Sequence, residues 1–138
     1  MKENKIEFKE IHVLLPAGSR PVNTLYYVVE NGRSAVIENL EKPDAGTFRI
    51  VDRIFAHMII KDPCRSKMVQ YRLRQHPQGE IKPIPHRFFF FRKFGNRIIF
   101  FDYRNKKKDS LGEEVYSMIE KKMRKYEKAF ERYRKEGE

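Results

Sequence analysis

The sequence has little cysteine and no long apolar run, and each shortage excludes a class of protein. Cys64 is the only cysteine, so an internal disulfide is excluded, and no Cys/His cluster has the spacing of zinc ligands. No apolar run approaches the length of a membrane span. Residues 1–10 are mostly polar and charged, so we expect no signal peptide. Internal repeats and low-complexity linkers are also missing. We therefore expect a soluble protein of a reducing compartment such as the cytoplasm, with no metal or other cofactor, in which Cys64 is a buried or idle thiol.

The chain is long enough for one domain with a proper core, and its charge is unevenly distributed. It has 138 residues, of which 40% are hydrophobic and 36% charged, and its net charge is +11. Residues 61–108 hold 14 Lys and Arg against three acidic residues, whereas the rest of the chain holds 16 basic and 16 acidic residues. The whole imbalance therefore lies in one segment. A confined positive field favours binding to RNA, DNA or another polyanion over a generally basic surface.

Hydrophobic periodicity predicts an α+β fold with a small antiparallel sheet. Alternating, β-branched and aromatic runs indicate strands, which we expect at residues 6–15, 25–29, 68–75, 88–91 and 98–101, with a short extended piece at 80–85. Apolar residues at helical spacing indicate two helices in the N-terminal half and one long C-terminal helix. We expect these helices at residues 34–40, at residues 43–60 and from Ser110 onward.

Each expected helix begins with a recognisable start signal. Ser34 is the expected N-cap of the first helix, although Asn31-Gly32 leaves a β-hairpin as the alternative. Pro43-Asp44 suits the start of the second helix, and Ser110 with Glu113 forms a capping box before the third. The third helix should bury one apolar stripe, made of Val115, Met118, Ile119, Met123, Tyr126, Phe130 and Tyr133.

A β-hairpin in the second half of the chain is the element around which the rest is organised. Four phenylalanines at residues 88–91 and the run Ile98-Ile99-Phe100-Phe101 lie on either side of a Gly-Asn turn. Runs this apolar fit strands that are covered on both faces, so we expect the phenylalanines in the core rather than stacked on bases. In an antiparallel hairpin the start of one strand lies beside the end of the other. Arg87 should therefore meet Tyr103 and Lys106-Lys107 at one end of the sheet.

A series of short motifs runs through the chain from residue 31 to residue 126. They are NGRSAVIENL at residues 31–40, EIK at 80–82, HRFFFF at 86–91, GNRIIF at 95–100, Lys106-Lys107, Glu113-Glu114, Lys121-Lys122-Met123 and Tyr126. In order and spacing these motifs resemble the RelE/HigB-like toxins of bacterial type II toxin–antitoxin systems, in particular the phage-derived, HigB-like branch. The resemblance covers about residues 25–128. It implies a single domain, with residues 1–22 as an N-terminal extension and residues 23–138 as the RelE/HigB-like core.

The chain departs from the family pattern at three places. Ala35 stands where the family has a proline, and Asp102-Tyr103 stands where it often has a histidine. The last helix is also longer than in the family.

The resemblance implies a ribosome-dependent mRNA endoribonuclease that needs no metal. In such cleavage the RNA 2′-hydroxyl attacks the adjacent phosphorus, and cations stabilise the charge that develops. Arg87 matches the family's arginine and is the expected phosphate clamp, because a planar guanidinium binds two phosphate oxygens at once. We assign catalysis to Arg87, Tyr103, Lys106 and Lys107, and His86 and Asp102 are the other proton carriers nearby. We assign nucleic-acid binding to Arg72, Arg74, Lys82, Arg92, Arg104 and Lys108.

These assignments have alternatives. In the alternative interpretation, Arg87 and Arg92 are solvated ends of strands. Tyr103 is a packing residue, and His86 is a structural histidine. For the whole protein, the alternatives are a non-catalytic nucleic-acid-binding protein on the same fold and a ParE-like gyrase inhibitor. As partners the resemblance implies mRNA with the ribosome and a cognate antitoxin protein, and we expect no contact with a membrane. The long C-terminal helix is a candidate contact for the antitoxin or for a second copy in a homodimer.

Overall fold

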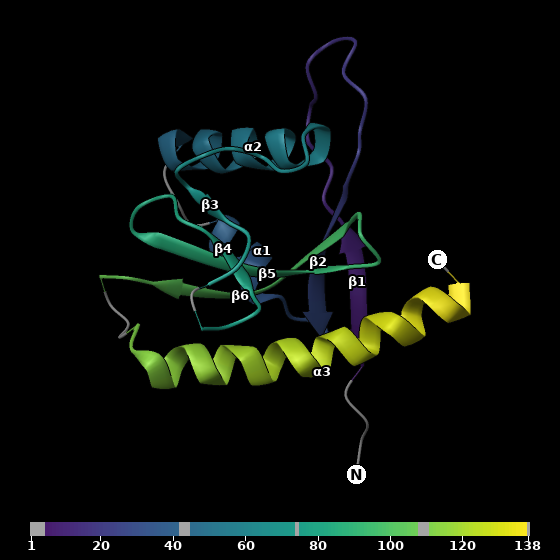
Figure 1. Cartoon of the computed structure of the whole chain (residues 1–138), viewed down its shortest axis with the longest axis vertical. Helices are drawn as coiled ribbons and strands as arrows, with labels where there is room; N and C mark the ends of the chain where they lie inside the picture. The colour runs from purple at the N-terminus through teal and green to yellow at the C-terminus, as the bar shows by residue number, and fades with distance from the viewer. Residues whose placement is uncertain (1–4, 42–44, 74, 108–110, 138) are drawn as a thin grey trace.

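The computed structural model describes residues 5–41, 45–73, 75–107 and 111–137, and in this part the chain forms a mixed six-stranded sheet packed between helices (Figure 1). The elements are β1 (Ile6–Glu10), β2 (Thr24–Glu30), α1 (Ala35–Leu40), α2 (Ala45–Ile60), β3 (Val69–Gln70), β4 (Gly79–Ile81), β5 (His86–Lys93), β6 (Arg97–Asn105) and α3 (Glu113–Gly137). Across the sheet the strand order is β1-β2-β6-β5-β4-β3. Helices α1 and α2 pack on one face and α3 crosses the other. The predicted α+β class is confirmed.

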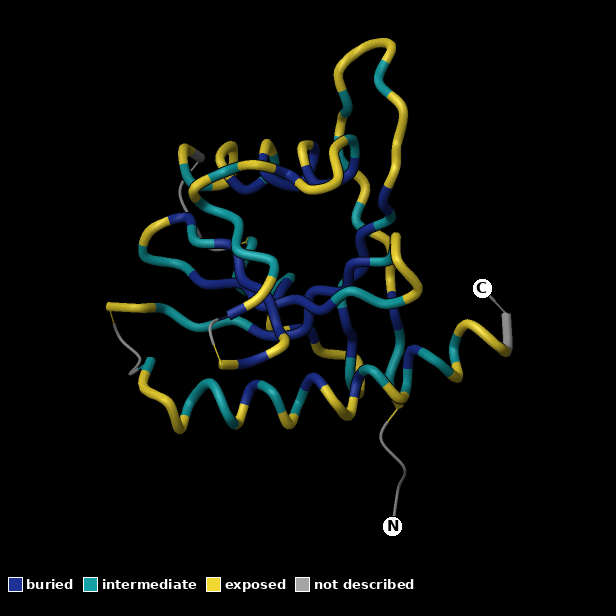
Figure 2. Tube along the Cα trace, in the orientation of Figure 1, coloured by how far each residue is buried: buried dark blue, intermediate teal, exposed yellow. Residues whose placement is uncertain are grey.

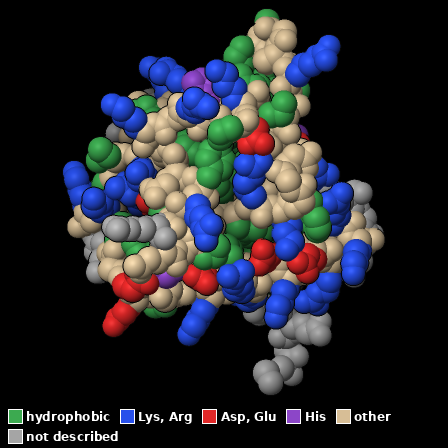
Figure 3. Space-filling model, viewed as in Figure 1, with side chains coloured by type: hydrophobic (Ala, Val, Ile, Leu, Met, Phe, Trp, Pro, Cys, Tyr) green, Lys and Arg blue, Asp and Glu red, His purple; other side chains and the backbone are tan. Residues whose placement is uncertain are grey.

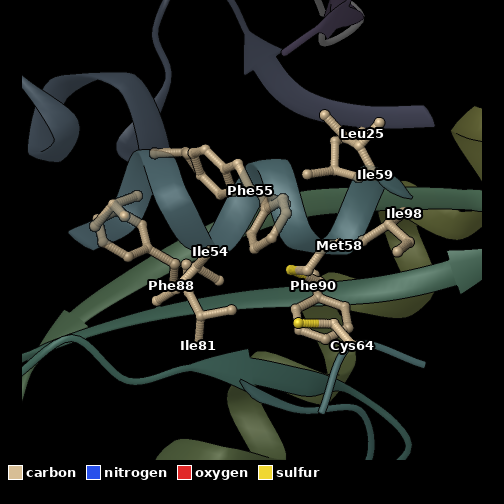
Figure 4. Close-up of a cluster of buried hydrophobic side chains, with 13 residues drawn as sticks. Leu25, Ile54, Phe55, Met58, Ile59, Cys64, Ile81, Phe88, Phe90 and Ile98 are labelled. Carbon is tan, nitrogen blue, oxygen red and sulfur yellow. The ribbon is translucent and has the colours of Figure 1, made fainter. Parts of the chain in front are cut away.

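The β5–β6 hairpin is covered on both faces, as its sequence predicts. Phe88 and Phe90 face the core beneath α2, where Phe88 lies near Ile54 and Phe90 near Met58 (Figure 4), whereas Phe89 and Phe91 face α3. All four phenylalanines are at most 3% exposed. A register shift between Phe89 and Phe90 marks a β-bulge in this pair of strands. Figure 2 shows that the buried part of the trace is concentrated in these central strands.

Strands β2 and β6 run parallel, which corrects the predicted antiparallel sheet. Their register pairs Thr24 with Arg97 and Tyr27 with Phe100. Parallel neighbours need a long crossover connection, and the segment from α1 to β5 supplies it. The other neighbouring strands pair antiparallel. Local periodicity predicts where strands lie but carries no information on the direction of a neighbour that is distant in sequence.

The N-terminal strand is shorter than expected and lies at the sheet edge. β1 ends at Glu10 rather than Leu15, although the amide of Ile11 still donates to the carbonyl of Leu25 at 2.8 Å. β1 pairs antiparallel with β2 along its whole length. The predicted N-terminal extension therefore contributes one strand to the sheet.

The strand predicted at residues 68–75 is wrong beyond its first residues. Only Val69 and Gln70 form β3, which pairs with β4. After it the chain turns, because the amide of Leu73 donates to the carbonyl of Gln78 at 3.0 Å and the amide of His76 donates to the carbonyl of Leu73 at 3.2 Å. The alternation in this segment reflects a turn that buries Leu73 and His76. The basic strand face expected from Arg72 and Arg74 does not form, since Arg72 is exposed in the turn and Arg74 lies outside the described residues.

The predicted helices are present. Ser34 caps α1, since its Oγ accepts a hydrogen bond from the amide of Ile37 at 3.2 Å. The predicted apolar stripes of α2 and α3 are buried or half-buried except for Phe48 and Met118, which are 49% and 55% exposed. The predicted starts at Pro43-Asp44 and Ser110 lie outside the described residues. Within the described part of the chain, no helix combines the length and the apolar character that a membrane crossing requires.

A buried histidine fixes the N-terminal half of α3 to the sheet layer. His76 is 8% exposed, and its two ring nitrogens each lie 2.8 Å from a carboxylate oxygen of α3, one from Glu113 and one from Glu120. The hydrogen bond from Glu120 is the main cause that raises the pKa of His76, with Glu113 adding to it. In turn, His76 lowers the pKa of Glu120. The charged form of His76 therefore joins the turn before β4 to α3.

This contact should make stability depend on pH. His76→Gln should lower the free energy of unfolding by about 1–3 kcal/mol at mildly acidic pH, the usual loss for a buried hydrogen bond to a charged group. A raised native pKa contributes stability that is present in full below the ordinary value of 6.5 and lost as pH rises through the native pKa. The difference between wild type and variant should therefore shrink in alkaline buffer. Urea unfolding, followed by circular dichroism at several pH values, measures the difference in unfolding free energy between wild type and His76→Gln. His57→Gln is the control, because His57 is exposed on α2; a difference for His76→Gln that does not change with pH would contradict the assignment.

Candidate functional site

The predicted residues gather at the end of the sheet where β5 begins and β6 ends. The register pairs His86 with Asn105 and Arg87 with Arg104. The amide of Lys106 donates to the carbonyl of Pro85 at 2.8 Å, which keeps the two chain segments together just beyond the strands. We call this end of the sheet the β5–β6 rim, made of residues 82–87 and 103–107. The prediction that these segments are neighbours is correct.

A histidine and a tyrosine form a hydrogen-bonded pair on the rim. The Nδ1 atom of His86 lies 2.6 Å from the hydroxyl oxygen of Tyr103, and both side chains are half-buried. Tyr103 also packs on Phe88, with 5.0 Å between ring centroids, so the α2 side of the sheet holds the phenol in place. Either ring of such a pair can pass a proton to the other, depending on the imidazole tautomer. The pair is therefore a candidate proton carrier.

Arg87 lies on the other face of the sheet, which corrects the expected single cluster. Successive side chains of a strand point to opposite faces; Phe88 packs with Tyr103 toward α2, so Arg87 points toward α3. Only 8% of Arg87 is exposed, and its Nη1 donates to the carbonyl of His86 at 3.0 Å. Its charge acts on Tyr116 of α3. In this structure Arg87 and Tyr103 share the end of the sheet but not one surface.

The groups around Arg87 form a buried polar layer beneath the first half of α3. Glu80 is 4% exposed, and burial is the main cause that raises the pKa of its carboxyl, against the opposing charges of Arg87, Lys82 and Lys106. Burial also raises the pKa of Tyr116, followed by the charge of Glu80. One carboxylate oxygen of Glu80, Oε2, has no hydrogen-bond partner among the described residues. This layer joins the strand ends to α3 through charges that lie away from water.

Asp102 belongs to the same buried layer and is not a free proton carrier. It is 3% exposed, and its Oδ1 accepts a hydrogen bond from the amide of Tyr103 at 2.9 Å. Its Oδ2 lies 3.3 Å from Nζ of Lys122 on α3 and 3.8 Å from Nη2 of Arg104. The carboxylate thus links β6 to α3. Arg104, one of the residues expected to bind nucleic acid, is half-buried within this contact.

The remaining predicted cations are spread over the molecule. Lys106 and Lys107 are exposed on the rim, and Lys82 is half-buried beside it. Arg92 lies at the opposite end of β5, where its guanidinium bonds both carboxylate oxygens of Asp62 at 2.8 and 2.9 Å. The prediction for Lys108 falls outside the described residues. The rim therefore gathers Tyr103, Lys106, Lys107 and Lys82, and it does not gather Arg72 or Arg92.

One hollow of the described part of the chain lies away from the rim. It measures about 640 Å³ and lies between the N-terminal segment, α1 and α2, with Tyr27, Leu40 and Phe48 in its wall. None of the predicted site residues that the structure describes lines it. Among the described residues, no group of three or more His, Cys, Asp or Glu side chains is placed to hold a metal ion.

Two parts of the site have no distinct signal in the sequence. Glu80 reads as an ordinary polar position in a short extended piece, and nothing near it predicts burial under a helix. The ties of Asp102 to Lys122 and of His76 to Glu113 and Glu120 join segments that are distant in sequence. Only the docking of α3 shows that these groups form one layer.

The buried carboxyl of Glu80 should be a net cost to stability when it is ionised. Its native pKa is raised above the ordinary value of 4.5, so the native state holds the proton more tightly than the unfolded chain, and stability falls as pH rises through that range. As the pH rises from acidic to neutral, the free energy of unfolding of Glu80→Gln should increase by about 1–3 kcal/mol relative to that of wild type. This is the scale of a buried polar group without a partner. Chemical unfolding at several pH values tests this, with the exposed Glu114→Gln as control. If the difference in unfolding free energy between Glu80→Gln and wild type stays constant from acidic to neutral pH, the prediction is wrong.

Comparisons of the chain with protein-family models, with curated proteins and with solved structures found no match, so the site is interpreted from its own geometry and from the motif resemblance alone.

Proposed function

We propose that this chain is the toxin of a type II toxin–antitoxin pair and acts in the cytoplasm as a ribosome-dependent, metal-independent mRNA endoribonuclease of the RelE/HigB type. The observation that carries the proposal is the hydrogen bond of 2.6 Å between His86 and Tyr103 on a rim that also presents Lys106. The motif resemblance and the net charge of +11 support the same class.

The rim residues can serve each part of the cleavage step. The 2′-oxygen of the RNA forms a bond to the adjacent phosphorus while the bond from phosphorus to the 5′-oxygen breaks. The 2′-hydroxyl proton goes to the Tyr103–His86 pair, and the leaving 5′-oxygen takes a proton from the same pair or from water. Lys106 and Lys107 stabilise the negative charge on the phosphoryl oxygens. The products are a 2′,3′-cyclic phosphate and a 5′-hydroxyl end.

Arg87 can act as the phosphate clamp only when α3 is displaced. A guanidinium binds a phosphate through direct hydrogen bonds, and here Arg87 is 8% exposed under the first half of α3. With α3 in place, Arg87 supports the rim indirectly, through its hydrogen bond to the carbonyl of His86. We therefore assign the first contact with RNA to the exposed Lys106 and Lys107. Arg87 would contact RNA only in a state in which α3 has moved.

A cognate antitoxin would neutralise the protein by occupying this basic end. Acidic side chains of the antitoxin would pair with Lys106 and Lys107, which are exposed. The same contact would exclude the RNA from the His86–Tyr103 pair. α3 is the other candidate contact, either for the antitoxin or for a second copy of the chain.

The second candidate is a nucleic-acid-binding protein of the same fold that does not cleave. The burial of Arg87 favours it, because the predicted clamp is covered in this structure. Exposed lysines alone bind a phosphate backbone without the precise placement that catalysis needs. The two candidates differ in one measurable product, the 5′-hydroxyl end.

Tyr103→Phe should abolish cleavage and keep the fold. The substitution removes only the hydroxyl that bonds His86, and loss of a general acid–base group slows a reaction by about 100-fold or more. His86→Gln should have a similar effect. Wild type added to a cell-free translation reaction should produce 5′-hydroxyl ends in the translated mRNA, and its induced expression should arrest growth. Tyr133→Phe is the matched control, because Tyr133 is a half-buried tyrosine of α3 far from the rim in sequence.

Two results would decide against the proposal. If folded wild type leaves translated mRNA intact while it still binds RNA, the non-catalytic candidate is correct. If Tyr103→Phe and His86→Gln cut as fast as Tyr133→Phe, the cleavage is real but the assigned proton carriers are wrong.

A further inference from the structure

Helix α2 carries a row of basic side chains on the side that points away from the sheet. Arg49, Arg53 and His57 recur every four residues, Lys61 follows at the same spacing, and all four are exposed. The amide of Lys61 donates to the carbonyl of His57 at 2.9 Å, so helical geometry continues to Lys61. Four residues advance an α-helix by about 6 Å, so the row is about 18 Å long. Figure 3 shows Lys and Arg side chains gathered around a histidine over α2, at the top of the view.

The side chains of this α2 row lack counter-charges within the described part of the chain. No ion pair or side-chain hydrogen bond joins Arg49, Arg53 or Lys61 to another described residue. Like charges four residues apart on a helix repel each other, so the row weakens α2 unless an external anion is present. α3 shows the opposite pattern, since Arg124 there lies 3.4 Å from Glu120, four residues before it.

Acidic groups near the α2 row are few. Asp52 is the one acidic residue in the sequence of α2. Asp62, which follows the row, is bound by Arg92 at 2.8 Å. Arg65 and Lys67, which both follow the buried Cys64, are exposed and add further positive charge. Glu10, Glu41 and Asp52 line the same hollow as Arg49. The excess of positive charge therefore lies from Arg53 to Lys67.

We propose that the α2 row (Arg49, Arg53, His57 and Lys61) binds the phosphate backbone of RNA and anchors it beyond the reacting nucleotide. Backbone binding needs several cations on a rigid element and no base contacts. The centre of a protein–protein interface is instead depleted of charged residues. The choice of RNA over DNA rests on the proposed function. The row lies on the outer side of α2, the helix that covers the face of the sheet on which Tyr103 packs.

The experiment compares two triple variants with the same change in net charge. The first, Arg49→Gln/Arg53→Gln/Lys61→Gln, removes three cations of the α2 row. The control, Lys121→Gln/Lys128→Gln/Arg132→Gln, removes three exposed cations of α3. Both are made in the Tyr103→Phe background so that RNA is not cut, and circular dichroism verifies the fold; glutamine suits exposed helix positions.

Fluorescence anisotropy measures binding to a labelled RNA hairpin and to a DNA hairpin of the same sequence across a range of salt concentrations. The α2-row variant should bind the RNA hairpin at least about tenfold more weakly than the parent, and the slope of log affinity against log salt should fall by about 2–3, one unit for each lost phosphate contact. The α3 control should keep an affinity within about threefold of the parent and a similar slope. RNA should bind more tightly than DNA.

Three other outcomes overturn the proposal, each in a distinct way. Unchanged RNA affinity in the α2-row variant excludes the row as an RNA contact. An equal loss in both triple variants means that total charge, not the row, sets the affinity. If the DNA hairpin binds as tightly as the RNA hairpin, RNA is not the specific ligand of the α2 row. Absence of mRNA cleavage by wild type, together with a selective loss of RNA binding in the α2-row variant, refutes the nuclease and leaves the row in place.

Discussion

Burial of the β5–β6 hairpin between two helical layers is the constraint on which the rest of the molecule depends. Phe88 and Phe90 anchor the layer that contains α2, and Phe89 and Phe91 anchor α3. Each fully buried phenylalanine contributes about 1.5–3 kcal/mol by leaving water, so neither layer can shift along the hairpin without a large loss. Side chains alternate between the two faces of the sheet along each strand. This alternation separates the phenylalanines, and it separates the neighbouring polar residues in the same way. Arg87 therefore joins the α3 side, and Tyr103 joins the α2 side.

This division sets what the rim can do. The His86–Tyr103 pair is half-buried near exposed lysines, so it can meet an RNA strand at the end of the sheet. On the α3 side, Glu80 and Asp102 are buried with Arg87. While α3 covers these residues, a ligand in solution cannot reach them. The candidate proton carriers and the candidate phosphate clamp thus lie toward opposite faces of the sheet. Contact of a phosphate with Arg87 needs a displacement of α3, not a change in the hairpin.

The sequence predicts those features that depend on neighbours along the chain. The apolar runs of the hairpin, the cap at Ser34 and the stripe of α3 are all local patterns, and the structure contains them. The parallel pairing of β2 with β6 and the bulge after Phe89 depend on distant contacts. Because the bulge in the β5–β6 pair places Arg104, and not Tyr103, opposite Arg87, the separation of Arg87 from Tyr103 could not be predicted. The four-residue spacing of the α2 row is visible in the sequence, but its meaning depends on knowing which helix face is buried.

Both halves of α3 combine apolar burial with polar contacts, and the polar contacts near Arg87 bear on its access. The C-terminal half packs through aromatic rings, with Phe130 at 4.9 Å from Phe8 and 5.3 Å from Tyr26 between centroids. The half over Arg87 buries Ile119 and Met123 in the same apolar layer. It adds polar contacts from His76 to Glu120 and from Asp102 to Lys122. Aromatic burial is insensitive to pH and weakly sensitive to salt, whereas ion pairs respond to both. Salt and pH should therefore weaken the contacts of His76 and Asp102 with α3 more than the apolar burial of Ile119 and Met123.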